Sequence, residues 1–189
     1  MRIISGAARN LELAALPDCE IRPTAVRARK ALFDSLGSWE GVAVLDLFSG
    51  SGALALEAAS RGADPVMMVE NDPRHQECIR ENCRRVAAAG AVGEKILLDF
   101  DALKPERYLG RLPRKPGVIF ADPPYAISGH CFRTLMRDTS FGAALSGGKL
   151  VWEIPDTPGA QADFLQAEAL TEIGFRRFGG TMFLLGIIK

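Results

Sequence analysis

Short apolar runs alternate with helix-length segments along the middle of the chain. Five such runs predict buried strands at residues 42–47, 65–70, 95–99, 117–121 and 149–154. Between them, Ala/Leu/Glu-rich residues 53–61 predict one helix, and Asp72-Pro73 predicts the capped start of another that runs to Ala89. Strands that are apolar throughout and alternate with helices indicate a parallel sheet covered on both faces.

The two ends of the chain do not follow this regular pattern. Residues 175–178 and 181–185 flank Gly179-Gly180, and this pattern predicts an antiparallel hairpin at the end of the sheet. The first forty residues are only weakly strand-like, until Thr24 predicts the cap of a helix that extends to Leu36.

Composition and charge set the broad class of protein. At 189 residues and 48% hydrophobic, the chain suits one ordinary domain, which we place at residues 41–189, with a small appendage of short strands plus a helix at residues 1–40. Its 23 basic and 23 acidic residues balance, which excludes a protein that holds nucleic acid by bulk positive charge alone. The N-terminus lacks the apolar run of a signal peptide and no run is long enough to span a bilayer, so we expect a cytoplasmic protein without membrane contact.

The four cysteines form no CxxC pair, and only two histidines, His75 and His130, could join them as ligands. Because this spacing does not match a zinc or other metal site, we expect no bound metal. Neither histidine adjoins a nucleophile motif, and both are interpreted as surface or helix residues.

A glycine-containing turn follows the first predicted strand, with Asp46 just before it and Ser49, Gly50 and Gly52 within it. Glycines at such a turn let a ligand approach the backbone near a helix N-terminus, but the pattern alone is shared with dinucleotide sites. Asp46 changes the balance: at ~6 Å and an effective dielectric near 20 it would oppose a phosphate charge by roughly 3 kcal/mol. The same carboxylate would attract an ammonium or sulfonium, so the loop favours S-adenosyl-L-methionine over NAD as cofactor.

Acidic residues also follow the next two predicted strands. Glu70 can accept hydrogen bonds from both ribose hydroxyls of an adenosine, and Asp101 from its adenine amino group. Their neighbours Asn71 and Ala102 complete this part of the predicted cofactor site. The carboxyl ends of parallel strands meet at one edge, which is where ligands bind in open α/β sheets.

The strongest chemical motif is Asp122-Pro123-Pro124-Tyr125, directly after the fourth predicted strand. Consecutive prolines hold the backbone extended and leave carbonyls available as acceptors. The Asp122 carboxylate and the Pro123 carbonyl can then accept from an exocyclic amino group, while Tyr125 offers a face on which a nucleobase stacks with roughly 1–3 kcal/mol. We therefore predict methyl transfer to an amino nitrogen, with Asp122, Pro123 and Tyr125 as catalytic residues and Pro124 and Tyr125 contacting the substrate.

Taken together, these motifs resemble class I S-adenosylmethionine-dependent methyltransferases that carry [DN]-P-P-[YF], and among them the RsmD-type 16S ribosomal RNA guanine-N2 methyltransferases. The resemblance spans nearly the whole chain, through segments 1–6, 22–24, 45–54, 101–103 and 122–125. It implies a Rossmann-like sheet of seven strands, transfer of a methyl group to N2 of a guanine in 16S rRNA within a small-subunit particle, and a monomer.

The same resemblance implies that Arg22 and Thr24 help to hold the cofactor and that Arg27 contacts the substrate. The family usually has a basic cluster after its first turn, whereas this chain has only Arg9, accompanied by Glu12. We retain Arg9 as a candidate substrate contact, although the departure weakens RNA docking by this segment.

RNA docking could also use two locally basic stretches, at residues 104–115 and 74–85. Other functions are also compatible with these sequence features. An adenine-N6 methyltransferase of DNA or RNA and a protein-glutamine methyltransferase would share the chemistry. A dinucleotide-binding oxidoreductase and a non-catalytic RNA-binding module would share the sheet.

Overall fold

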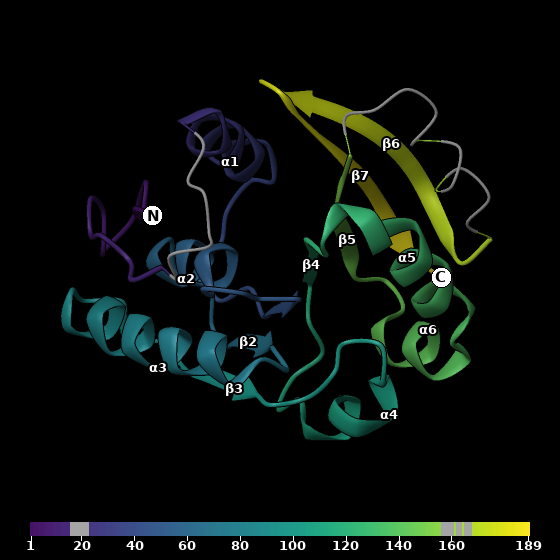
Figure 1. Ribbon diagram of the computed structural model, residues 1–189, viewed down its shortest axis with the longest axis horizontal. Coiled ribbons are helices and arrows are strands. Elements are labelled where there is room, and N and C mark those ends of the chain that lie inside the picture. Colours follow the sequence, from purple (N-terminus) through teal and green to yellow (C-terminus); the bar gives the residue numbers. More distant parts are fainter. Residues whose placement is uncertain (16–22, 156–160, 162–163, 165–167) are drawn as a thin grey trace.

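The sheet predicted from the strand pattern forms the centre of the molecule (Figure 1). The computed structural model describes residues 1–15, 23–155, 161, 164 and 168–189, with only the backbone described at residues 23–25. Over these residues, seven strands form one sheet in the order β3-β2-β1-β4-β5-β7-β6. The mostly parallel sheet with an antiparallel end is therefore confirmed.

The first five strands are parallel and the last two are antiparallel. The parallel strands are β1 (Val44–Leu47), β2 (Val66–Val69), β3 (Lys95–Leu98), β4 (Val118–Ala121) and β5 (Lys149–Ile154). The hairpin comprises β6 (Leu170–Phe178) and β7 (Thr181–Ile188). It is longer than predicted, and β7 lies between β5 and β6 because it pairs with both.

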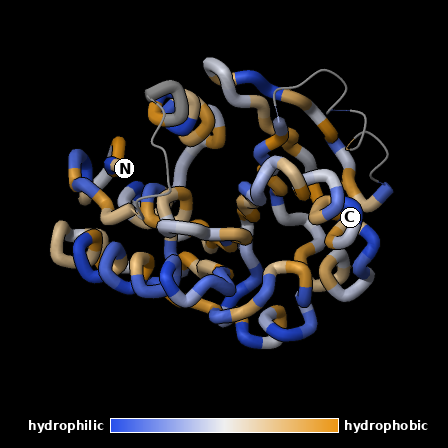
Figure 2. The backbone as a smooth tube through the Cα atoms, viewed as in Figure 1, coloured by the Kyte–Doolittle hydropathy of each residue, from blue (hydrophilic) through white to orange (hydrophobic). Residues whose placement is uncertain are grey.

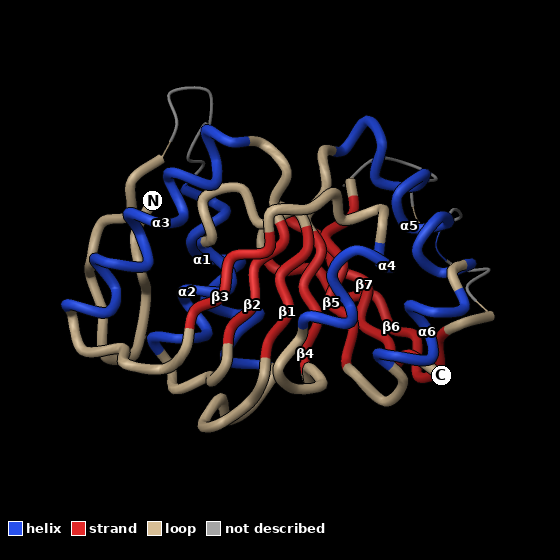
Figure 3. The backbone as a smooth tube through the Cα atoms, turned by 90° about the horizontal axis from the view of Figure 1, so that it is seen from below, coloured by secondary structure: helices blue, strands red, loops and turns tan. Residues whose placement is uncertain are grey.

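Helices cover both faces of the sheet, as Figure 3 shows from a second direction. The helices are α1 (Pro23–Ser35), α2 (Ala53–Ser60), α3 (Pro73–Ala88), α4 (Pro105–Tyr108), α5 (Ser128–Arg137) and α6 (Thr139–Leu145). One apolar cluster joins α1, α2 and α3 to one face, and a second joins α4, α5 and α6 to the other. Hydrophilic and hydrophobic residues alternate along α3, so the helix buries one side and exposes the other (Figure 2).

Two helix starts show how local chemistry sets the boundaries. The Asp72 carboxylate accepts from the backbone N–H of Arg74 at 2.8 Å, and Pro73 begins α3, as predicted. The prediction for α1 was wrong: the helix begins at Pro23, so Thr24 is its second residue and not its cap. Proline lacks an N–H and has a helical φ, which favours it in the first turn.

The N-terminal residues attach to α2 through buried polar groups. The backbone N–H groups of Ile4 and Ser5 donate to the Glu57 carboxylate at 2.7 and 3.2 Å. Gly6 has φ +83° and lies so close to Ser60 that an added Cβ would be 1.7 Å from its carbonyl oxygen. The segment therefore packs directly on the sheet domain, and Ile3 belongs to the same apolar cluster as α2.

None of the helices described is long and apolar enough to cross a membrane.

Candidate active site

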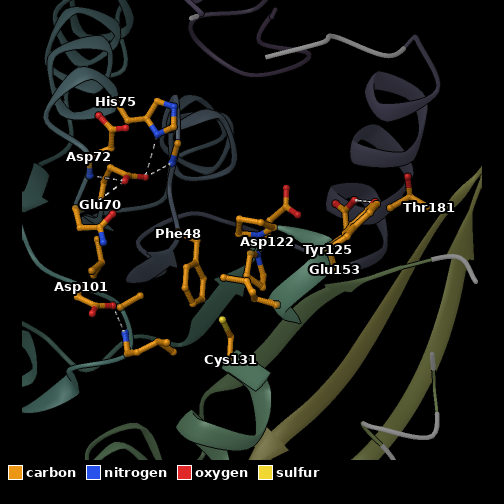
Figure 4. Close-up of a pocket in the computed structure, with 18 of the residues that line it drawn as sticks. Phe48, Glu70, Asp72, His75, Asp101, Asp122, Tyr125, Cys131, Glu153 and Thr181 are labelled. Atoms are coloured by element: carbon orange, nitrogen blue, oxygen red, sulfur yellow. Dashed lines mark hydrogen bonds and ion pairs between the residues drawn. The ribbon is translucent and has the colours of Figure 1, made fainter. Parts of the chain in front are cut away.

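A cavity of about 800 Å³ opens at the carboxyl edge of the parallel strands. It brings together nine residues of the predicted site, namely Gly50, Glu70, Asn71, Asp101, Ala102, Asp122, Pro123, Pro124 and Tyr125. Figure 4 shows two groups of polar side chains, one around Glu70 and His75 and the other around Asp122 and Tyr125, with Phe48 between them. The two ends of the cavity therefore carry different sets of polar groups.

The glycine turn after β1 is fixed by its own hydrogen bonds. The Ser49 hydroxyl donates to the backbone carbonyl of Asp46 at 2.6 Å, and the N–H of Gly52 donates to the carbonyl of Ser49 at 2.7 Å. Gly50 has φ +55° and nothing within 4 Å of the position a Cβ would take, so it leaves room beside the backbone. Phe48 also has a positive φ, 59°, which costs free energy for a residue with a side chain and is typical of functional loops.

Asp46 lies beneath this turn and is 1% exposed. Its Oδ2 accepts a hydrogen bond from the N–H of Ala55, the third residue of α2, at 3.2 Å. Burial, together with the nearby Glu70 charge, raises the pKa of the Asp46 carboxyl to about 7, against the lowering effect of the Ala55 hydrogen bond. A positive charge close to Asp46 would stabilise the ionised carboxylate and so lower its pKa.

Glu70 joins the ends of β1, β2 and α3. Its carboxylate accepts from the backbone N–H of Gly50 at 2.8 Å and from those of Asn71 and Asp72 at 2.9 Å each. The Nδ1 atom of His75 lies 3.7 Å from Oε2 of the same carboxylate. Glu70 is therefore held rigidly at the cavity wall by the chain around it.

Asp101 follows β3 on the same side of the cavity. Its Oδ1 accepts from the N–H of Leu103 at 2.9 Å, and its Oδ2 lies 3.7 Å from the Lys104 ammonium. The backbone carbonyl of Ala102 accepts from the hydroxyl of the fully buried Tyr108 at 3.1 Å. These bonds fix the turn that carries the predicted adenine contact.

The Asp122-Pro123-Pro124-Tyr125 segment forms the other end of the cavity. Burial raises the pKa of Asp122 well above the usual carboxyl range, and the negative charges of Glu153 and Asp46 raise it further. Tyr125 begins a short 3₁₀ turn before α5, is 43% exposed, and donates its hydroxyl to Glu153 Oε1 at 2.6 Å. This end therefore combines an acid of raised pKa with an accessible aromatic face.

Two candidates from the N-terminal forty residues, Arg9 and Arg27, do not lie among the residues that line the cavity. Arg9 and Arg27 are exposed, Arg27 on α1. Arg22 lies outside the described residues, and of Thr24 only the backbone is described. Their roles remain predictions.

The cavity also contains residues that sequence reasoning missed, including Phe48, His75, Cys131, Glu153 and Thr181. His75 was interpreted as a surface or helix residue; it lies on α3 but faces the cavity (Figure 4). Glu153 carried a usable signal, because it is the acidic residue of an otherwise apolar strand end. Thr181 carried none, since its place depends on how the hairpin packs.

The basic stretches expected to dock RNA are partly occupied by internal contacts. On α3, Arg80, Arg84 and Arg85 lie within 2.7–3.9 Å of the carboxylates of Glu77 and Glu81. In the other stretch, the Arg111 guanidinium lies 4.8 Å from the centre of the Phe100 ring. Arg114 donates to the backbone carbonyls of Gly41 and Asp64.

Over the described residues, no group of three or more His, Cys, Asp or Glu is arranged to hold a metal ion.

Comparisons with known proteins agree with this picture. A family described as conserved hypothetical protein 95 matches residues 1–184. The Escherichia coli (strain K12) protein named ribosomal RNA small subunit methyltransferase D is 31% identical over 126 residues, 66% of this chain and 60% of that relative. The Bacillus subtilis protein YlbH is 34% identical over 85 residues, 44% of this chain and 46% of that relative. The matched part thus spans about half to three fifths of these relatives.

Solved structures share the architecture over almost the whole chain. A hypothetical protein from Thermus thermophilus is 28% identical with a TM-score of 0.73, covering 100% of this chain and 99% of that one. A methyltransferase from Pyrococcus furiosus is 17% identical with a TM-score of 0.69, covering 95% and 89%. The predicted Rossmann-like methyltransferase fold is confirmed by these likenesses.

Proposed function

The chain belongs to the conserved hypothetical protein 95 family, the RsmD family, and from this premise we propose that it transfers a methyl group from S-adenosylmethionine to N2 of a guanine in 16S ribosomal RNA. One observation carries the proposal. The Asp122-Pro123-Pro124-Tyr125 segment shares one cavity with Gly50 of the glycine turn and Glu70, so an amino group bound at one end would face a cofactor bound at the other.

A buried acid beneath the glycine turn, outside the residues that line the cavity, fits this cofactor. Asp46 is buried and its pKa is raised to about 7, so a nearby cation would stabilise its charged form. S-Adenosylmethionine carries an ammonium and a sulfonium and, when bound, supplies an electrophilic methyl group. We assign Asp46 to the cationic part of the cofactor, Glu70 to its ribose hydroxyls and the Asp101 turn to its adenine. Gly50, Asn71 and Ala102 line the surrounding wall, and we assign Ser49 and Gly52 to the turn that holds Gly50 in place.

At the opposite end, we propose that Asp122 and the Pro123 carbonyl accept hydrogen bonds from the two hydrogens of the target amino group. These bonds orient the nitrogen lone pair toward the methyl donor, and such orientation is a large source of rate enhancement. Because its pKa is raised, Asp122 is also suited to take the proton that the nitrogen loses on methylation. Tyr125, which is exposed enough to be reached, provides the stacking face for a base turned out of its helix.

The balanced charge of the chain bears on the form of the substrate. With 23 basic and 23 acidic residues, and with the α3 arginines paired to neighbouring acids, long-range attraction to naked RNA is weak. We therefore propose that the enzyme, a monomer, recognises its guanine in a folded site of a small-subunit particle, where shape and protein contacts add to phosphate contacts.

Methyl transfer from labelled S-adenosylmethionine tests the proposal directly. Naked 16S RNA, assembled small subunits, DNA and total protein are offered in parallel, and the labelled product is digested to nucleosides or peptides. We expect N2-methylguanosine from the subunits. Label on adenine or on glutamine would overturn the guanine assignment, and absence of label on every substrate would overturn the enzymatic assignment.

Asp122→Asn and Asp99→Asn form a matched pair of variants for this assay. Both acids follow the end of a strand and are exposed, but only Asp122 lines the cavity. We expect at least about a hundredfold loss of methylation for Asp122→Asn, the scale seen when one transition-state hydrogen-bonding group is removed. Asp99→Asn should retain wild-type activity.

Calorimetry separates the cofactor class independently of activity. We expect saturable binding of S-adenosylmethionine that weakens in Asp46→Asn. Binding of NAD without binding of S-adenosylmethionine would instead favour an oxidoreductase with the same sheet.

A further inference from the structure

Glu153 is an acid at a strand end to which the proposed mechanism gives no role. It is the fifth residue of β5, between the buried Trp152 and Ile154, and its side chain is only partly buried. It lines the same cavity as Asp122 and Tyr125. A carboxylate at the wall of a functional cavity can accept hydrogen bonds from a bound ligand.

The strand register sets Glu153 beside Asp122. β4 and β5 are parallel, with Ala121 opposite Trp152, so Asp122, directly after β4, and Glu153, still within β5, lie at the same level. In a parallel pair, residues at the same level project to the same face of the sheet. Figure 4 shows Asp122, Tyr125 and Glu153 gathered at one end of the cavity. Their electrostatic coupling agrees with this proximity, since the charge of Glu153 helps to raise the pKa of Asp122.

Tyr125 fixes the direction of the Glu153 carboxylate. Its hydroxyl donates to Oε1 at 2.6 Å, across a sequence separation of 28 residues. A carboxylate has two oxygens and room for about four hydrogen bonds, and this bond orients the group. A base stacked on the Tyr125 ring would therefore bring its edge toward two carboxylates at once.

Two neighbouring carboxylates match only one of the bases that carry an exocyclic amino group. An ionised carboxylate accepts hydrogen bonds and cannot donate them. In guanine the amino group lies beside a ring N–H, so this edge presents donors at adjacent positions. In adenine and cytosine the amino group lies beside a ring nitrogen with a lone pair, which would face the second carboxylate without a proton between them.

Resting on the proposed function, we infer that Glu153 accepts the ring N1–H of the target guanine while Asp122 holds its amino group, and that Glu153 thereby selects guanine over adenine and cytosine. Glu153 is then a specificity-determining residue, and Tyr125 has a second role as the residue that positions it. Sites built to hydrogen-bond one donor discriminate strongly against analogues that lack it, because a buried acceptor is left unpaired.

The sharpest test uses small-subunit RNA with 2-aminopurine at the methylated position. This base keeps the amino group of guanine but has a lone pair where guanine has N1–H. We expect the wild-type protein to methylate it about ten- to a hundredfold more slowly than guanine, the range of discrimination from one well-placed base contact. Glu153→Gln, whose amide can donate to that lone pair, should reduce or reverse the preference.

The ratio of the two substrates is measured within each variant, so a loss of folded protein cancels. The fluorescence of 2-aminopurine gives a second readout without methyl transfer, and Glu153→Gln should bind the 2-aminopurine RNA at least as tightly as the wild type does. Tyr125→Phe keeps the ring but removes the hydroxyl, and should lower discrimination less than Glu153→Gln. Cofactor affinity, measured by calorimetry, should stay unchanged in both variants.

The outcomes separate the two proposals. If the wild type methylates guanine but Glu153→Gln leaves the ratio between guanine and 2-aminopurine unchanged, Glu153 does not read the base and this inference fails alone. If the wild type labels a base other than guanine, the proposed function fails and this inference fails with it.

Discussion

Glu57 on α2 and Asp46 near the end of β1 are both buried carboxylates. They differ in how far hydrogen bonds and nearby positive charges offset the cost of removing them from water. Glu57 is 0% exposed and accepts from the N–H groups of Ile4 and Ser5 and from Arg61 Nε at 2.7–3.2 Å. Asp46 is 1% exposed, yet its carboxylate accepts from the N–H of Ala55 at 3.2 Å. Hydrogen bonds and a counter-charge offset the desolvation of Glu57, and much less offsets that of Asp46.

The difference separates an acid that holds the fold together from one suited to bind a ligand. Glu57 ties the N-terminal residues to α2, so its partners belong to the chain. The pKa of Asp46 is raised because few groups of the chain stabilise its charge, and a cationic ligand could stabilise it instead. Burial alone therefore does not identify a functional acid in this protein, whereas burial with few internal partners does.

The largest effect is expected from removing the compensated acid. Glu57→Ala leaves two backbone N–H groups and the Nε of Arg61 without their acceptor, and should lower the free energy of unfolding by about 3–5 kcal/mol in urea titrations. Glu57→Gln, which keeps an acceptor oxygen, should cost less. Equal stability of Glu57→Ala and wild type would contradict the assignment of Glu57 as a structural acid.

Asp46→Asn should raise the free energy of unfolding, whereas Glu57→Ala should lower it. Since the folded-state pKa of Asp46 is raised to about 7, ionisation above that pH destabilises the fold, by up to about 4 kcal/mol relative to a normal carboxyl. The Asn variant should therefore be more stable than the wild type at about pH 8. The gain should shrink as the pH falls from about 7 toward 4 and vanish below the unfolded-state pKa of 3.8, where the wild-type carboxyl is protonated in both states. A stability loss at pH 8 would show that Asp46 is already compensated.

The affinity for S-adenosylmethionine should depend on pH through the ionisation of Asp46. A cation binds the charged form of Asp46, so S-adenosylmethionine affinity should fall by up to about tenfold per pH unit below about 7 and level off above it. Asp122, also with a raised pKa and coupled to Glu153 and Asp46, can steepen the fall. Calorimetry in buffers of different ionisation enthalpy should show proton release. Asp46→Asn should flatten the profile, and proton uptake would refute the model of a cation at Asp46.

An exposed acid supplies the smallest expected effect and the baseline for the comparison. Asp34 lies 2.5 Å from Lys30 in a solvent-exposed i,i+4 pair on α1. Lys30→Gln should change the free energy of unfolding by no more than about 0.5 kcal/mol, because water solvates both charges well. A loss of several kcal/mol would mean that exposure does not separate the classes of acid.

The sequence allowed much of the sheet and cavity to be predicted because both follow from local pattern. Apolar runs marked the parallel strands. Asp46 lies near the end of its strand and Glu70, Asp101 and Asp122 follow theirs, so they reach one edge by topology alone. Glu153 is the same kind of residue on the next parallel strand. It was missed because no adjacent motif accompanies it.

What could not be predicted depends on distant contacts. The attachment of Ile4 and Ser5 to Glu57 spans more than fifty residues, and no local pattern announces it. The role of Glu57 was hidden for the same reason, since an acid in an Ala/Leu-rich helix normally faces solvent. At α1, two plausible start signals compete, Pro23 and Thr24, and proline at the first turn prevails.

The position of β7 has a consequence for how the protein is made. β7 is the last strand of the sheet along the chain, yet it lies between β5 and β6 and pairs with both. During synthesis β5 therefore keeps an open edge, and β6 has no neighbour, until residues beyond Thr181 have left the ribosome. Open strand edges invite pairing with other chains. Truncation before Thr181 should thus produce an aggregating polypeptide and not a smaller enzyme, and the rim residue Thr181 would be absent from the cavity.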